Sequence, residues 1–135
     1  MTQINSYLTF NGNCREAMSF YKECLGGKLT LQTIGESPLS EKMPKKMKDC
    51  ILHSTLTNDN LVVMGSDMVP DNGLVKGNSV SLLLKCSSEQ EIKNLYKKLS
   101  SGGKSKHPLK NTFWGALFAD LTDKFGNRWL LHFQQ

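Results

Sequence analysis

The sequence has no long apolar run. No stretch approaches the roughly 18 apolar residues that a membrane-spanning helix requires. The start, MTQINSYLTF, also lacks the basic segment and apolar run of a secretion signal. We therefore expect a cytoplasmic protein without a membrane partner.

Motifs for the common catalytic and cofactor chemistries are also missing. The sequence contains no G-x-S-x-G, no helical H-E-x-x-H and no phosphate-binding P-loop. The four cysteines, at 14, 24, 50 and 86, are scattered and form no C-x-x-C pair. We expect reduced thiols that pack as small apolar side chains, with a redox or nucleophilic cysteine as the alternative.

The chain carries an excess of positive charge. Its net charge is +5, from 17 basic and 12 acidic side chains, and much of the excess lies in residues 42–48. No nucleic-acid module and no interleaved aromatic residues accompany these lysines. We therefore expect a solvated lysine-rich loop and no nucleic-acid partner. The prolines and serines of residues 35–46 favour a mobile loop, which often acts as a lid.

A repeated pattern is the strongest positive feature. Residues 14–28 (CREAMSFYKECLGGK) and 88–104 (SEQEIKNLYKKLSSGGK) each predict an amphipathic helix that ends in Gly-Gly-Lys. Each helix follows a strand-like run, at 4–10 and 80–86, and precedes three more. Those later runs lie at 28–34, 50–57 and 61–66 in the first half, and at 105–110, 114–121 and 127–133 in the second.

This repeat predicts an α+β fold made of two tandem βαβββ modules. We expect module 1 at about 1–70 and module 2 at about 77–135, within a single domain covering 1–135. The strands should form a curved eight-stranded sheet around a cleft, and clefts are where small molecules bind.

Several polar residues have local structural interpretations. Asn13 is expected to cap the first helix, with Glu16 three residues later. Asn58-Asp59-Asn60 predicts a hairpin turn. Asp67 is interpreted as a strand-end cap and Asp123 as a turn residue.

Four segments together resemble a known family. They are YLTFNGNC at 7–14, FYK running to the Gly-Gly at 26–27, His53-Ser54 running to VMGSD at 63–67, and Trp114-Gly115 running to TDKFGNRW at 122–129. In this order they are similar to the vicinal oxygen chelate superfamily of glyoxalase I, bleomycin-resistance proteins and extradiol dioxygenases. The closest resemblance is to its PhnB-like group, from which the chain departs at Lys124, where proline is common.

The resemblance also bears on activity and assembly. It implies a homodimer. The label "demethylubiquinone methyltransferase-like", sometimes attached to the PhnB-like group, finds no support in these residues, because no strand leads through a glycine-rich turn into a helix.

The resemblance implies where a metal ion would bind, with one ligand on each of four strands. The matching positions hold Asn5, Met64, Leu130 and a serine at 79 or 81. Because Met64 and Leu130 cannot ligate a hard ion, we expect no complete metal site and no cofactor. The alternative is an atypical divalent-metal site of His53 and His132 with a carboxylate partner, either the one at position 67 or the one at 120.

We therefore expect a small-molecule-binding protein of the PhnB-like, glyoxalase fold. The alternative is a metal-dependent lyase or dioxygenase, and whether the protein is an enzyme stays open, with His53 as a weak candidate for acid–base catalysis. Trp129 is expected in the core and His107 in an exposed loop, whereas Trp114 and Phe118 are expected on one face of a strand. The predicted ligand-binding residues are Asn5, Tyr7, His53, Met64, Trp114, Phe118 and His132.

Overall fold

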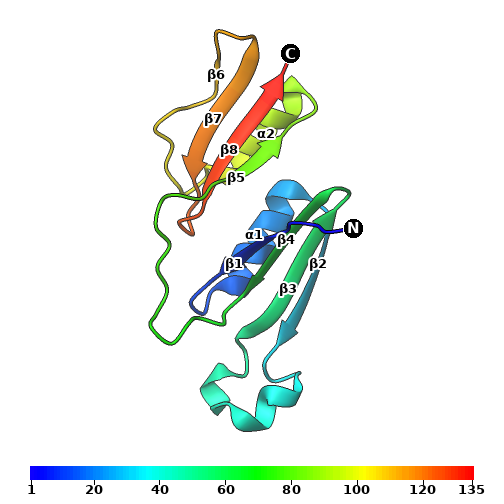
Figure 1. Cartoon of the computed structure of the whole chain (residues 1–135), viewed down its shortest axis with the longest axis vertical. Helices are drawn as coiled ribbons and strands as arrows, with labels where there is room; N and C mark the ends of the chain where they lie inside the picture. The colour runs from blue at the N-terminus through cyan, green and yellow to red at the C-terminus, as the bar shows by residue number, and fades with distance from the viewer. The chain divides into compact units, whose positions relative to one another are not determined.

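The same βαβββ arrangement occurs twice along the chain (Figure 1). The computed structural model describes all residues, Met1–Gln135, and divides into two units, Met1–Val75 and Lys76–Gln135. The predicted α+β fold with two repeated modules is confirmed. The eight strands form two four-stranded sheets.

The N-terminal unit contains one helix and one sheet in the order β1-β4-β3-β2. β1 and β4 are parallel, and the other neighbours are antiparallel. Two short 3-10 helices, η1 (Pro38–Lys42) and η2 (Lys45–Met47), lie in or next to the segment expected as a loop. The regular elements are β1 (Ser6–Thr9), α1 (Cys14–Leu25), β2 (Lys28–Thr33), β3 (Ile51–Asn58) and β4 (Leu61–Ser66).

The C-terminal unit repeats this topology, with the sheet order β5-β8-β7-β6. β5 is parallel to β8, and the remaining pairs are antiparallel. None of the helices in the chain is long and apolar enough to cross a bilayer. The elements are β5 (Leu82–Lys85), α2 (Glu89–Leu99), β6 (Lys110–Asn111), β7 (Ala116–Thr122) and β8 (Arg128–Gln134).

The repeated Gly-Gly pair marks the same close packing in both units. A Cβ atom on Gly27 would lie 2.2 Å from the carbonyl oxygen of Thr57, at the end of β3. A Cβ on Gly103 would lie 2.2 Å from the carbonyl oxygen of Thr122, at the end of β7. Each helix therefore leads into a segment that lies against a strand so closely that only glycine fits. The sequence repeat is a structural repeat.

The start of α1 is capped differently from the prediction. Asn13 occupies the N-cap position but its side chain makes no capping hydrogen bond. Instead, Asp67 Oδ1 accepts from the backbone N–H groups of Gly12 (2.9 Å) and Cys14 (3.0 Å), and Oδ2 accepts from that of Ile51 (2.8 Å). A buried carboxylate just after β4 thus replaces the local cap. Its negative charge also interacts favourably with the positive end of the α1 dipole. α2, by contrast, has a local cap, because Ser88 Oγ accepts from the Glu91 N–H (3.0 Å).

Asp123 and Trp129 anchor the turn between β7 and β8. Asp123 Oδ1 accepts from the N–H groups of Phe125 (2.8 Å) and Asn127 (3.1 Å). Its Oδ2 accepts from Trp129 Nε1 at 2.8 Å, and both residues are almost fully buried. The predicted turn role of Asp123 and the predicted core position of Trp129 are confirmed.

Three predicted strand positions are wrong. Asn5 precedes β1, and Trp114 lies in the turn 112–115 before β7 rather than on a strand. The expected strand at 105–110 is reduced to Lys110–Asn111, preceded by an isolated bridge between Lys104 and Thr122. Pro108 has no N–H to donate to a ladder, which accounts for the interruption.

Candidate functional site

Residues 104–107 of the C-terminal unit run beside β7 in place of a regular strand. Lys104 and Thr122 exchange two backbone hydrogen bonds of 2.8 Å each, and the Asp120 N–H donates to the His107 carbonyl oxygen at 3.2 Å. Ser105 Oγ donates to the Asp120 carbonyl oxygen (2.8 Å) and accepts from the hydroxyl of Tyr96 on α2 (2.8 Å). This irregular edge is therefore attached to both the sheet and the helix.

A histidine–aspartate pair lies at the end of this segment. His107 Nδ1 and Asp120 Oδ2 are 2.8 Å apart, and the His107 N–H donates to Asp120 Oδ1 at 3.3 Å. Because a carboxylate can only accept, Nδ1 carries the hydrogen of this bond. In the neutral ring, Nε2 then keeps a lone pair that can accept a proton. His107 is exposed, as predicted, but its ring has a fixed orientation that suits proton transfer to a bound molecule.

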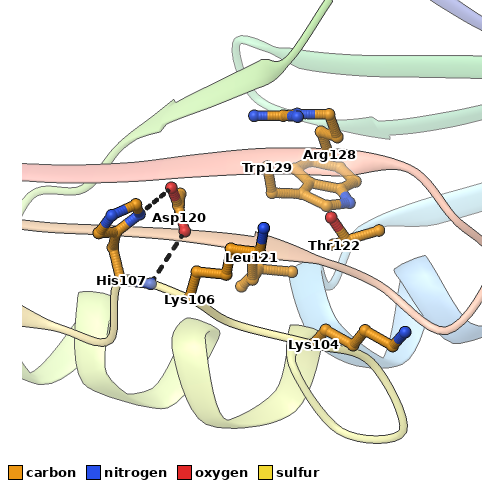
Figure 2. A pocket seen from close by; sticks show the side chains of 8 residues that line it. All are labelled: Lys104, Lys106, His107, Asp120, Leu121, Thr122, Arg128 and Trp129. Atoms are coloured by element: carbon orange, nitrogen blue, oxygen red, sulfur yellow. Dashed lines mark hydrogen bonds and ion pairs between the residues drawn. The ribbon is translucent and has the colours of Figure 1, made fainter. Parts of the chain in front are cut away.

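One side of this pair is a cationic hollow (Figure 2). Its volume is about 360 Å³. Trp129 and Leu121 contribute apolar surface, whereas two lysines, one arginine and a hydroxyl supply polar surface. The lining residues are Lys104, Lys106, His107, Asp120, Leu121, Thr122, Arg128 and Trp129.

The other side is an aromatic hollow of about 520 Å³. The rings of Phe113 and Trp114 meet edge to face, with centroids 4.8 Å apart. Phe118, on β7, lies opposite Lys110 of β6 and His132 of β8 in the sheet register. The lining residues are His107, Lys110, Asn111, Thr112, Phe113, Trp114, Phe118 and Asp120.

Two of the predicted ligand-binding residues therefore meet in this hollow, although not for the predicted reason. Trp114 and Phe118 were expected to share a face of one strand, but Trp114 belongs to a turn. That turn is closed by the Gly115 N–H donating to Thr112 O at 3.2 Å, with Gly115 at φ +84°. His132 is next to Phe118 across the sheet but does not line the aromatic hollow.

The other predicted residues gather in the N-terminal unit. Tyr7 is paired with Met64, and Met64 with Thr55, so these side chains share the sheet face opposite the buried Ser54. His53 lies on that face too, with its ring 6.3 Å from the Tyr7 ring and its Nε2 3.2 Å from Thr55 Oγ1. Asn5 is exposed and accepts from Gln3 Nε2.

The residues of this chain do not fit a divalent metal ion at the positions that the resemblance implies. The thioether of Met64 and the alkyl group of Leu130 offer no ligand to a hard ion. No group of three or more His, Cys, Asp or Glu side chains is close enough to hold a metal. Of the suggested carboxylate partners, Asp120 is paired with His107, and Asp67 is occupied by three backbone amides.

Burial disfavours the reactive thiolate form at three of the four cysteines. Burial raises the pKa of Cys14 to about 11, and the nearby Asp67 charge acts in the same direction. Burial, helped by the charge of Glu91, likewise raises the pKa of Cys86 to about 11. Cys50, which is half-buried, also has a raised pKa because of burial. Because the thiolate is the reactive form, these cysteines favour the packing role.

Sequence reasoning missed the two hollows and the pair between them. His107 was interpreted as a loop residue, and Asp120 as a partner for other histidines. The run Lys104-Ser105-Lys106-His107 was the available signal, since it places three basic side chains within one short segment. Only the fold shows that this segment lies against Asp120.

Comparisons with known proteins identify the family. The family model described as "3-demethylubiquinone-9 3-methyltransferase" matches residues 2–132. Protein PA1353 from Pseudomonas aeruginosa is 38% identical, with a TM-score of 0.89 over 100% of this chain and 99% of that chain. A structure described as "Putative 3-demethylubiquinone-9 3-methyltransferase, PhnB protein, from Bacillus cereus" is 27% identical, with a TM-score of 0.75 over 98% of this chain and 99% of that one. Protein YjdN from Escherichia coli (strain K12) is 29% identical, over 96% of this chain and 93% of that protein.

A more distant structure shows the fold alone. A glyoxalase-related enzyme from Fulvimarina pelagi is 16% identical and has a TM-score of 0.64, over 99% of this chain and 89% of that one. The predicted resemblance is thereby confirmed at the level of family and fold. The chain belongs to the PhnB-like family described as 3-demethylubiquinone-9 3-methyltransferase and has the glyoxalase/bleomycin-resistance fold.

Proposed function

We propose that this protein binds a small organic molecule with a flat aromatic part, and that the aromatic hollow of the C-terminal unit holds that part. The observation that carries this proposal is the lining of the hollow, in which Phe113, Trp114 and Phe118 border a space of about 520 Å³. Ligand sites in proteins commonly combine apolar or aromatic walls with a few polar groups. Lys110, Asn111 and Thr112 supply such groups here.

The exposure of the aromatic residues supports the proposal. Phe113 is 97% exposed and Trp114 is 52% exposed, so folding leaves nearly all of the Phe113 surface and half of the Trp114 surface in contact with water. Covering apolar surface is worth roughly 25 cal/mol per Å², and a stacked aromatic pair adds about 0.5–1.5 kcal/mol. A flat ligand therefore gains affinity from surface that the fold itself leaves uncovered.

The test is a thermal-shift and calorimetric screen of flat aromatic compounds, since a ligand that binds only the folded protein raises its apparent stability. Trp114→Ala should weaken binding of any hit by at least about 10-fold, roughly 1.4 kcal/mol. Val80→Ala is the matched control, because Val80 is an exposed apolar residue of the same unit that does not line the hollow. Equal binding by wild type and Trp114→Ala would contradict the assignment.

Fluorescence offers a second readout of the same site. Trp114 and Trp129 are the two tryptophans, and Trp129 is only 1% exposed. Quenching by a ligand in the aromatic hollow should therefore act mainly on Trp114 and disappear in Trp114→Phe. Tyr7→Ala would show whether the residues predicted in the N-terminal unit also contribute to binding.

Our proposal further includes that the ligand binds without a metal ion, and that the protein is cytoplasmic. The family resemblance adds that it is a homodimer. Metal analysis of protein purified without chelator tests the first point. Stoichiometric metal that is lost in His53→Ala would favour the alternative, a metal-dependent lyase or dioxygenase. Light scattering of the purified protein tests the oligomeric state.

A further inference from the structure

The cationic hollow contains positive charge that the protein does not neutralise. Lys104, Lys106 and Arg128 line it, and none of them forms an ion pair. Arg128 makes a single long side-chain hydrogen bond, from Nε to Ser81 Oγ at 3.4 Å. Three cations around a space of about 360 Å³ create a positive potential that attracts an anion.

The backbone that carries these cations is held in place. Lys104 is fixed to Thr122 by the two hydrogen bonds of the bridge, and Arg128 begins β8 opposite Thr122. Lys106 lies between two residues, Ser105 and His107, that are each bonded to Asp120. The three cationic side chains (Figure 2) therefore extend from a backbone that is held in place, with Lys104 and Lys106 exposed and Arg128 half-buried.

The one carboxylate of the hollow is already engaged. Both oxygens of Asp120 accept hydrogen bonds from His107, one from the ring and one from the backbone. Asp120 therefore repels an incoming anion less than a free carboxylate would, because both of its oxygens are already bonded to N–H groups of His107. His107 and Asp120 also line the aromatic hollow, so the two spaces meet at this pair.

We infer that the ligand is an aromatic anion, whose ring occupies the aromatic hollow and whose oxyanion lies against Lys104, Lys106 and Arg128. This inference rests on the proposed function and adds the chemical class of the ligand. A carboxylate and a phosphate monoester share the required chemistry, a compact group of oxygen acceptors with negative charge. A phosphate offers more acceptor oxygens for lysine and arginine donors.

The experiment compares three probes with the same ring: 2-naphthol, 2-naphthoate and 2-naphthyl phosphate. Calorimetry on the full chain should show that at least one anionic probe binds about 10-fold or more tightly than the neutral 2-naphthol. The relative affinities of the carboxylate and the phosphate identify the oxyanion. The affinity of the anions should fall from low salt to about 0.5 M salt, because exposed charges are screened, whereas that of 2-naphthol should not fall.

The double variant Lys104→Ala/Lys106→Ala should remove the advantage of the anionic probe and leave 2-naphthol binding unchanged. Lys97→Ala is the matched control, since Lys97 is an exposed lysine of α2 that does not line the hollow. Inorganic phosphate should compete with the anionic probes only. Circular dichroism of each variant checks that the fold is intact.

The outcomes separate this inference from the proposed function. If 2-naphthol binds and depends on Trp114 while the anionic group adds no affinity, the inference is overturned and the proposed function stands. If none of a wider set of flat aromatic compounds binds, the proposed function fails and the inference fails with it. An anionic advantage that survives in Lys104→Ala/Lys106→Ala would place the anion elsewhere and also overturn the inference.

Discussion

Replacing Asp67 by alanine should destabilise the N-terminal unit strongly. The carboxylate is 7% exposed and accepts from three backbone amides, those of Gly12, Cys14 and Ile51. These bonds join the turn after β1, the start of α1 and the start of β3. The Asp67→Ala variant leaves all three donors without their acceptor.

The magnitude follows from the cost of unpaired buried donors. A hydrogen bond to a charged group contributes about 1.5–3 kcal/mol, and loss of a helix cap costs about 1 kcal/mol. Water entering the vacated space recovers part of this loss, so we expect about 3–5 kcal/mol for Asp67→Ala. That is a large fraction of the roughly 5–15 kcal/mol that stabilises a typical domain.

Urea unfolding followed by far-ultraviolet circular dichroism measures the effect. Asp67→Asn should cost less than Asp67→Ala, because the amide retains one acceptor oxygen. Asp71→Ala is the control, since it removes the same charge from an exposed loop, and it should change stability by no more than about 0.5 kcal/mol. Both tryptophans lie in the C-terminal unit, so their fluorescence reports whether that unit unfolds in the same transition. A loss below about 1 kcal/mol in Asp67→Ala would refute the reasoning.

Three further predictions concern packing and the thiols. Gly103→Ala should lower the free energy of unfolding, measured with urea, by at least about 2 kcal/mol, because its Cβ would overlap the Thr122 carbonyl oxygen. A variant as stable as the wild type would show that the close contact between residue 103 and β7 does not require glycine. Cys14 and Cys86 should react with iodoacetamide at pH 8 much more slowly than Cys50, which is half-buried, and mass spectrometry after timed labelling would contradict this if all react alike. Because Cys14 and Cys86 hold their protons up to a pKa of about 11 in the fold but ionise near 9.0 when unfolded, their linkage effect is nil below pH 9 and lowers stability between about pH 9 and 11.

The candidate site was only partly predictable from the sequence. Tyr7 and His53, which the sequence analysis expected to bind a ligand together, share one face of the N-terminal sheet, since side-chain direction along a strand is a local property. The pairing of His107 with Asp120 was not predictable, because it depends on which segment lies beside β7. Trp114 was expected in the binding site, and it lines the aromatic hollow from a turn whose position sequence periodicity did not reveal.

The sequence by itself determined the repeat, since helix periodicity, strand alternation and the Gly-Gly stops at 26–27 and 102–103 are encoded by neighbouring residues. Only the tertiary structure decided which distant groups complete each other. Asn13 has the chemistry of a helix cap, yet Asp67, 54 residues away in sequence from that position, does the capping because β4 ends beside α1. Hydrogen bonds and charges act through space, so the partners of Asp67 and Asp120 depend on how distant strands and loops pack.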